Sequence, residues 1–238
     1  MNRKVLAIIA LGIISILAIT GVSYAVSPQE QARIAAEEGL PMLLKNIAEP
    51  EPQLFYFSNK DEVMRATLGT PLENFTITEG NFDEGKSVDE QMKPYPFYVF
   101  PLVVDGRVTT DLTVALQNGK WEVIDIGGCL NKNIHEVSKN NNLTASKVLR
   151  FAGKTFVLAK KGDSEVAYSP YNDPAGLKSG VLMSPDEFKV TLAKRQREVL
   201  EFKGKDLLGG NVSTAPLEFK QDSIYERLIR FVRHKYFL

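Results

Sequence analysis

The sequence predicts an α+β protein in which helices flank sheets built from antiparallel hairpins and meanders. Asp105-Gly106 and Asn118-Gly119 each separate two strand-like runs, and such pairs are the strongest short signals of two-residue hairpin loops. Lys161-Gly162-Asp163 predicts a third hairpin turn. Ser27 and Ser184 each precede a glutamate by three residues, the spacing of a helix capping box. These turns and caps predict alternating helices and antiparallel strands.

The N-terminal segment has the order of a secretory signal peptide. Met1–Lys4 is basic, Val5–Thr20 is almost wholly apolar, and small residues precede a cleavage position after Ala25. We therefore expect a secreted or extracytoplasmic protein whose mature chain begins at Val26. The alternative is an uncleaved membrane anchor, since a span needs about 20 apolar residues. Peptide mapping that finds Met1–Lys4 in the native protein would support the anchor.

Composition limits the remaining possibilities. The 238-residue chain has 29 basic and 29 acidic residues, so no excess of positive charge favours nucleic acid. Its single cysteine, Cys129, excludes an intrachain disulfide, and the fold must depend on its apolar core. A translocated chain without disulfides suggests a bacterial protein.

The length suits one large domain or two small modules. We interpret 26–128 as an N-terminal α+β module with a three-stranded meander, and 129–205 as a second α+β segment with a hairpin and a helix. Residues 206–238 contain a basic amphipathic helix.

The first module begins with a helix capped by Ser27 and ended by Gly39, and a second short helix reaches Ile47. Runs rich in β-forming residues predict strands at Leu54–Phe57 and Leu72–Thr78. Between them, Asn59–Leu68 is predicted to be a helix that ends at a glycine. Glu79–Lys93 is acidic and unpatterned, which indicates an exposed loop.

The two glycine turns predict the register of the meander. Two-residue loops place Val104 opposite Arg107 and Gln117 opposite Lys120. Counting away from the turns gives the pairs Val103–Val108, Val99–Leu112, Phe97–Val114, Leu116–Trp121 and Val114–Val123. These side chains share one face, which we expect to be the core, with Trp121 buried against Leu116. The middle strand turns Thr109, Asp111 and Thr113 outward.

The outer strand of the meander has a second apolar face formed by Tyr98, Phe100 and Leu102. Pro101 indicates an edge strand, because proline has no N–H for a ladder. We expect a helix or downstream segment to cover this face, since large exposed apolar patches are uncommon on monomers. The alternative is a binding surface formed by these three side chains.

The second segment alternates between strands and helices. Ile124 and Ile126 fall out of phase, which predicts a bulge at the end of the meander. Periodicity and turn signals then predict a short helix in Asn131–Asn142, strands at Lys147–Ala152, Thr155–Lys160 and Glu165–Ser169, and a helix from Ser184 to about Lys203.

A final helix begins near Asp222 and has an apolar face beside a basic one. Its basic residues are Arg227, Arg230, Arg233 and Lys235. A basic amphipathic helix can lie on an anionic membrane or cell-wall surface. We favour an ordinary terminal helix packed on the core, because Glu226 interrupts the basic side.

Catalytic and metal-binding signals are weak. Cys129 follows two glycines at a predicted helix start, where a thiolate is favoured. His135 lies about 240° further around that helix, so a cysteine hydrolase would need His234 as its base. Two histidines and one cysteine match no zinc spacing, and the sequence indicates no metal and no cofactor.

The sequence therefore favours a non-enzymatic, secreted or cell-envelope module that binds a protein, a peptide or a cell-wall component. Helices followed by a meander are similar in architecture to small peptidase-inhibitor (cystatin-type) or propeptide modules, although no motif identifies a family. Two alternatives stay open: a hydrolase that uses Cys129, and a structural envelope protein tethered to the membrane by its N-terminal segment.

Overall fold

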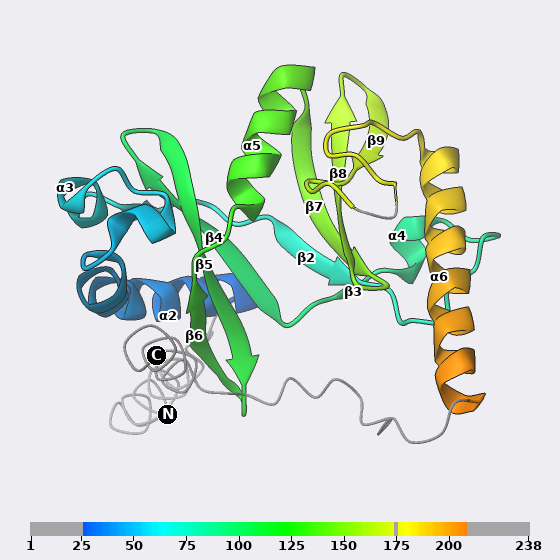
Figure 1. Ribbon diagram of the computed structural model, residues 1–238, viewed down its shortest axis with the longest axis horizontal. Coiled ribbons are helices and arrows are strands. Elements are labelled where there is room, and N and C mark those ends of the chain that lie inside the picture. The colour runs from blue at the N-terminus through cyan, green and yellow to red at the C-terminus, as the bar shows by residue number, and fades with distance from the viewer. Residues whose placement is uncertain (1–25, 174–175, 209–238) are drawn as a thin grey trace, which may run out of the picture.

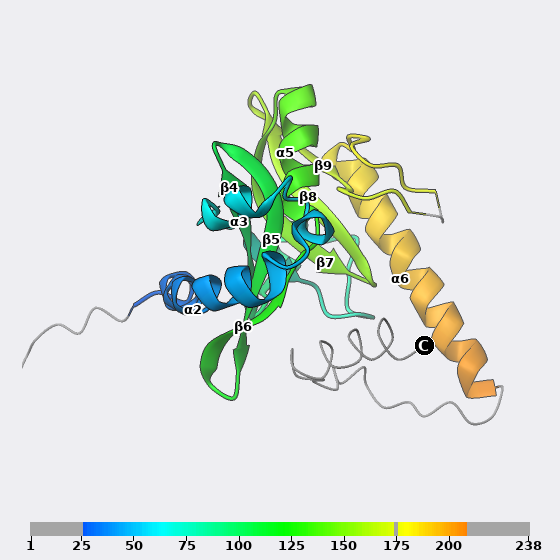
Figure 2. The ribbon, with the colours of Figure 1, turned by 60° about the vertical axis from the view of Figure 1, so that its left-hand side comes forward.

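The computed structural model describes residues 26–173 and 176–208, and it confirms the predicted α+β class (Figure 1). The predicted signal peptide and the predicted helix from Asp222, with His234, lie outside these residues. The described strands form two sheets, in the orders β1-β4-β5-β6 and β3-β2-β7-β8-β9. We call them the first and second sheets. Helices α2 and α6 pack at opposite ends of the molecule, α2 on the first sheet and α6 on the second (Figures 1 and 2).

The first sheet contains the predicted meander. Its strands are β1 (Thr67–Leu68), β4 (Phe97–Val104), β5 (Arg107–Gln117) and β6 (Lys120–Ile126). Both glycine turns are confirmed: φ is 50° and 79° at Asp105 and Gly106, and 49° and 79° at Asn118 and Gly119. Positive φ at both central residues defines the tight turn that matches the twist of antiparallel strands.

Valine at either turn glycine should destabilise the protein. A Cβ at Gly106 or Gly119 would meet no atom within 4 Å, so the cost is backbone strain alone. A β-branched residue resists this left-handed region, and we expect Gly106→Val and Gly119→Val each to cost about 1–2 kcal/mol. Thermal melting checks this, with Gly106→Asn as a control that tolerates the region. Unchanged melting of both valine variants would contradict the turn assignment.

Part of the predicted register is wrong. The pairs next to the turns are confirmed, as are Val103–Val108, Leu116–Trp121 and Val114–Val123. A bulge in β5, where Thr109 has no partner in β4, shifts the register between Val103 and Leu102 by one residue. Val99 therefore lies opposite Thr113 and Phe100 opposite Leu112. The predicted bulge at Ile124 is confirmed by a second shift in register. A bulge inserts one residue, and a one-residue shift exchanges the two faces of a strand.

The shift places Phe100 and Leu102 in the core of the first sheet. Both are fully buried, together with Leu112 and Val114, under α2 (Pro28–Leu43). Val99 points to the opposite face, toward the second sheet. Strand β4 is also not an edge, because β1 pairs with its end and Gly69 N–H donates to the Pro101 carbonyl. Both faces of β4 are therefore covered.

Trp121 is not the buried core residue that the sequence predicted. It is half-buried at the border of the core, with its ring 5.4 Å from that of Tyr98. Its cross-strand neighbour Leu116 is 43% exposed. The tip of the β5–β6 hairpin, next to this pair, extends beyond α2 (Figure 2).

The N-terminal helices differ from the predicted ones at their ends. Helix α2 continues through Gly39 and Pro41 and is followed by a π-helix, η1 (Leu44–Ala48). Gly39 allows α2 to pack closely on β6, because a Cβ at this position would lie 2.8 Å from Val123 Cγ2. Leu54–Phe57 is no strand: residues Pro52–Phe55 form a 3-10 helix, η2. Helix α3 spans only Lys60–Met64, because β1 begins soon afterwards.

The second sheet combines two parts of the chain. Strands β2 (Glu73–Thr76) and β3 (Lys93–Pro94) come from the first module, and β7 (Thr144–Phe151), β8 (Lys154–Lys161) and β9 (Ser164–Tyr168) come from the second. Strands β2 and β7 pair in parallel, unlike the antiparallel pairs elsewhere. Within the predicted loop at 79–93, Ser87 and Glu90 form a capping box that opens α4 (Val88–Gln91).

Helix α5 (Leu130–Asn141) lies between the two sheets (Figure 1). Its Leu130 and Ile134 share an apolar cluster with Val99 of β4 and Tyr168 of β9. Helix α6 (Pro185–Leu208) covers the other face of the second sheet through Phe188 and Leu192. The 26–128 and 129–205 segments are thus joined by a common sheet and a common apolar cluster.

Candidate functional site

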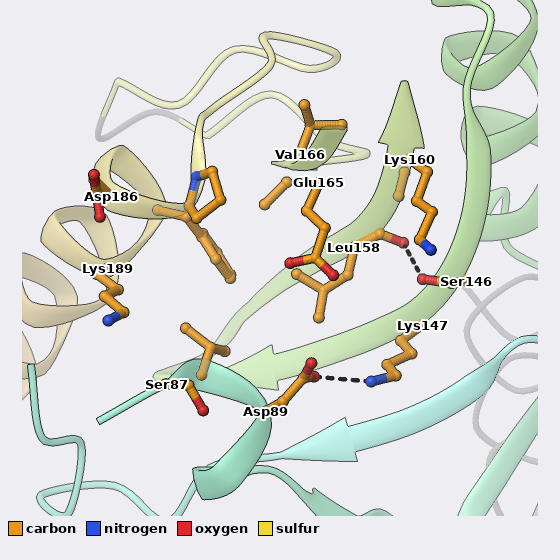
Figure 3. Close-up of a pocket in the computed structure, with 15 residues that line it drawn as sticks. Ser87, Asp89, Ser146, Lys147, Leu158, Lys160, Glu165, Val166, Asp186 and Lys189 are labelled. Carbon is orange, nitrogen blue, oxygen red and sulfur yellow. Dashed lines mark hydrogen bonds and ion pairs between the residues drawn. The ribbon is translucent and has the colours of Figure 1, made fainter. Parts of the chain in front are cut away.

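A pocket of about 270 Å³ opens over the second sheet, beside the first turns of α4 and α6 (Figure 3). Four stretches of sequence line it: Ser87–Asp89, Ser146 and Lys147 of β7, the hairpin β8–β9, and Pro185–Lys189. Small-molecule sites are commonly about 300–1,000 Å³. The pocket is therefore suited to one large side chain or a short chain segment.

Strand register explains the floor of the pocket. Leu158 lies opposite Ala167, and Lys160 lies opposite Glu165. Because alternate residues share a face, these four side chains point to the face on which α6 packs. Phe188 forms a wall, and its ring lies 5.2 Å from Phe156, which holds the start of α6 on the sheet. Leu158 and Ala167 make the floor apolar, and this wall is apolar too, while Lys160 and Glu165 stand at the rim.

The rim of the pocket carries both signs of charge. Lys147 of β7 and Asp89 of α4 form an ion pair of 2.8 Å across one side. Four further charged side chains have no ion pair among the described residues: Lys160, Glu165, Asp186 and Lys189. In Figure 3 the Glu165 carboxylate reaches toward the centre of the pocket, beside Leu158. Charged groups without partners are available to a ligand.

The helices beside the pocket are capped internally. The Ser184 hydroxyl accepts a hydrogen bond from Glu187 N–H, and the Glu187 carboxylate accepts hydrogen bonds from Ser184 N–H and Oγ. These hydrogen bonds to Ser184 lower the pKa of Glu187. The capping box predicted at Ser184 is thus confirmed, and it fixes where α6 leaves the sheet.

A second polar cluster lies between the sheets, at the start of α5. Asp111 of β5 is 2% exposed and accepts hydrogen bonds from Leu130 N–H at 2.6 Å, from Asn131 N–H at 3.3 Å and from Asn131 Nδ2 at 2.8 Å. The expectation that Asp111 and Thr109 face solvent is therefore wrong, since α5 and the second sheet cover that face. Burial raises the pKa of Asp111, against these hydrogen bonds and the charge of Arg150, which lower it.

Arg150 and Tyr171 lie near this carboxylate. The Arg150 guanidinium stacks 4.7 Å from the ring centroid of Phe97, which ties β7 to β4. Burial lowers the pKa of Arg150, and its Nε has no hydrogen-bond partner among the described residues. Burial also raises the pKa of Tyr171 to about 12, so its phenol is neutral at physiological pH. This cluster links the two sheets.

Cys129 occupies the N-cap position of α5, as the sequence predicted for a helix start. It is partly exposed, and its Sγ accepts a hydrogen bond of 3.6 Å from Asn133 Nδ2. His135 is exposed further along α5, and among the described residues no hydrogen bond joins it to the thiol. The remaining candidate base, His234, lies outside the described residues.

The other candidate residues are placed as follows. Phe100 and Leu102 are fully buried and Tyr98 is half-buried, which leaves the first two no surface for a partner. The basic residues Arg227, Arg230, Arg233 and Lys235 lie outside the described residues. Within 26–173 and 176–208, His, Cys, Asp and Glu form no group of three that could hold a metal. No helix in those ranges is both long and apolar enough to cross a membrane.

Sequence patterns did not reveal the pocket. Ser87–Glu90 has the capping-box spacing, but it stands in an acidic stretch without periodicity. Lys160 and Glu165 flank a predicted hairpin turn, which indicates that they are neighbours but not that a helix stands over them.

Comparison with family models, curated proteins and solved structures gives no match to this chain.

Proposed function

We propose that this protein is a secreted or cell-envelope binding module, without enzymatic activity, that holds a peptide or protein partner at the pocket over the second sheet. The observation that carries the proposal is an apolar floor surrounded by charged side chains of both signs, which form no ion pair among the described residues. A polypeptide offers the matching chemistry, since its apolar side chains can fill the floor while its polar groups meet the rim.

The mixed rim argues against a nucleic-acid partner. Phosphate backbones are bound by surfaces with an excess of Lys and Arg. Here Lys160 and Lys189 stand beside Glu165 and Asp186, and the chain as a whole has no net charge. A cell-wall peptide fits the same pocket chemistry as a protein segment.

The location of the protein is part of the proposal and rests on the N-terminal sequence. A basic start, an apolar stretch and small residues before Val26 support translocation, with cleavage or with retention as a membrane tether. The mass of the native protein distinguishes the two.

A second candidate function is a hydrolase that uses Cys129, favoured by the position of the thiol at the start of α5. Its Sγ contacts the amide of Asn133, which does not activate a thiol as a histidine does. Rapid labelling of Cys129 by iodoacetamide at neutral pH, faster than that of free cysteine, would support the hydrolase.

The binding proposal is tested with a variant of the pocket floor. Leu158 is partly exposed, so Leu158→Gln should retain the fold while it removes apolar surface from the pocket. We expect it to lose about tenfold in affinity for partners captured from the secreted fraction, as one buried apolar side chain is worth about 1.5–3 kcal/mol.

Val190→Gln is the matched control, because Val190 is 60% exposed on α6 and does not line the pocket. Equal capture by wild type, Leu158→Gln and Val190→Gln, with equal melting temperatures, would contradict the proposal.

A further inference from the structure

The edge of β9 beside the pocket has a backbone N–H and C=O that form no hydrogen bond within the described part of the chain. Ala167 N–H and C=O exchange hydrogen bonds of 3.0 and 2.8 Å with Met183, on the side away from β8. In an antiparallel strand every second residue points its N–H and C=O to the same edge. Glu165 therefore points its own N–H and C=O to that edge, where no described residue pairs with it.

The chain that pairs with Ala167 leaves the edge just before it reaches Glu165. Met183 runs antiparallel to β9, and continuation of that strand would place Pro185 opposite Glu165. Instead Ser184 caps α6 and Pro185 begins the helix, so the chain turns away. Both Glu165 and Pro185 line the pocket, which thus lies where the strand would have continued.

We propose that an extended peptide completes this edge, with its N-terminal residue paired antiparallel to Glu165 and its first side chain in the pocket. The inference rests on the proposed function and specifies its ligand. An unpaired backbone donor and acceptor on one strand edge are matched by an extended polypeptide, as in binding by strand addition. Antiparallel order is the one that Met183 already follows on this edge.

Two features select the end of a peptide and a bulky apolar first residue. A residue before the one opposite Glu165 would overlap Ser184, so the peptide must begin there. Directly opposite residues share a face, and the Glu165 side chain points over the pocket floor. The first side chain of the peptide would therefore lie beside Glu165 at the outer edge of the pocket, where Pro185 and Phe188 of α6 also line it.

The charges near this position are consistent with a free amino group. Asp186 stands in the first turn of α6, where the strand ends, and Glu165 is the pairing residue. Lys160 lies one strand further in, opposite Glu165, and Lys189 lies one helical turn beyond Asp186. Two carboxylates, those of Glu165 and Asp186, therefore belong to the residues on either side of the amino end.

The probes for the test are tetrapeptide amides X-Ala-Thr-Ala with X as Leu, Phe or Ser, each with a free amino terminus, and acetyl-Leu-Ala-Thr-Ala amide. Binding to the full-length ¹⁵N-labelled protein is followed by amide chemical shifts. We expect the Leu and Phe peptides to shift the amides of Glu165 and its neighbours. The Ser peptide and the acetylated peptide should bind at least about tenfold more weakly, because they lose the apolar contact or clash with Ser184.

Two variants isolate the backbone bond. Glu165→Pro removes the outward N–H but no hydrogen bond to β8, whereas Glu165→Gln keeps the N–H, and both remove the carboxylate. We expect Glu165→Pro to bind the Leu peptide about tenfold more weakly than Glu165→Gln, because a backbone donor is lost. The wild-type comparison of free and acetylated peptides remains decisive if Glu165→Pro fails to fold.

Equal binding of the free and acetylated peptides, or equal affinities of the two variants, overturns strand addition at Glu165. Absence of binding by all the free peptides overturns it too. The capture experiment with Leu158→Gln judges the proposed function separately, since a partner that needs Leu158 but not the Glu165 N–H would support the pocket and reject this mode of binding.

Discussion

Phe100→Ser is expected to bring the protein close to unfolding. The Phe100 ring is fully buried between α2 and the first sheet, where the Arg33 guanidinium lies 5.7 Å from its centroid. Truncation of a buried aromatic costs about 3–5 kcal/mol. The serine hydroxyl would add about 1–3 kcal/mol if it found no partner. Domains are commonly stable by only about 5–15 kcal/mol.

Urea denaturation followed by circular dichroism measures this effect. Leu116→Ser is the matched control on the neighbouring strand, because Leu116 is 43% exposed and should lose about 1 kcal/mol or less. A Phe100→Ser protein with the wild-type midpoint would show that α2 does not cover this face. In that case Tyr98, Phe100 and Leu102 would again become candidates for a binding surface.

Asp111→Ala is expected to produce the second large loss, about 3 kcal/mol. The carboxylate accepts three hydrogen bonds from Leu130 and Asn131, and the substitution leaves these buried donors without an acceptor. It also detaches the first turn of α5 from β5, so the junction between the sheets should loosen. Hydrogen exchange of the Leu130 and Asn131 amides should accelerate more than that of the α6 amides.

Asp111→Asn is the conservative control, since its amide keeps one acceptor oxygen and nearly the same volume. It should lie between wild type and Asp111→Ala in free energy of unfolding. An alanine variant as stable as wild type would mean that water or another group replaces the carboxylate.

Wild type and Asp111→Asn also test the raised pKa of Asp111. Because its pKa in the folded state lies above the ordinary value of 3.8, the folded state favours the protonated group. That contribution to stability is complete below the unfolded pKa and is lost as pH rises through the folded pKa. The stability of wild type relative to Asp111→Asn should therefore fall from acidic toward neutral pH. A rise would mean that the hydrogen bonds outweigh burial.

Local chemistry determined the parts of the fold that depend on a few neighbouring residues. Asp105-Gly106 and Asn118-Gly119 tolerate positive φ, and this alone fixes both turns and the pairs beside them. Ser184 and Glu187 satisfy each other's backbone groups within one turn, so the start of α6 could be predicted. These features need no distant contact.

The register of β4 could be predicted from local residues only next to the turn. Counting from Asp105-Gly106 was correct for Val104 and Val103 but failed from Leu102 onward, because Thr109 forms a bulge in β5. Both faces of β4 carry apolar side chains, so alternation could not show which face α2 would cover. In the structure, Ala32 and Ala36 of α2 are buried in the same apolar cluster as Phe100, so α2 covers the Phe100 face.

Asp111 and the pocket were decided by tertiary structure alone. Asp111 alternates with apolar neighbours as a solvent-facing residue would, and it is buried because the first turn of α5 lies over it. The pocket joins Ser87–Asp89, the β8–β9 hairpin and Pro185–Lys189, which are far apart in the chain. Each stretch has only a local pattern. Their convergence follows from how α4 and α6 pack on the second sheet, which depends on burial of apolar area between distant segments.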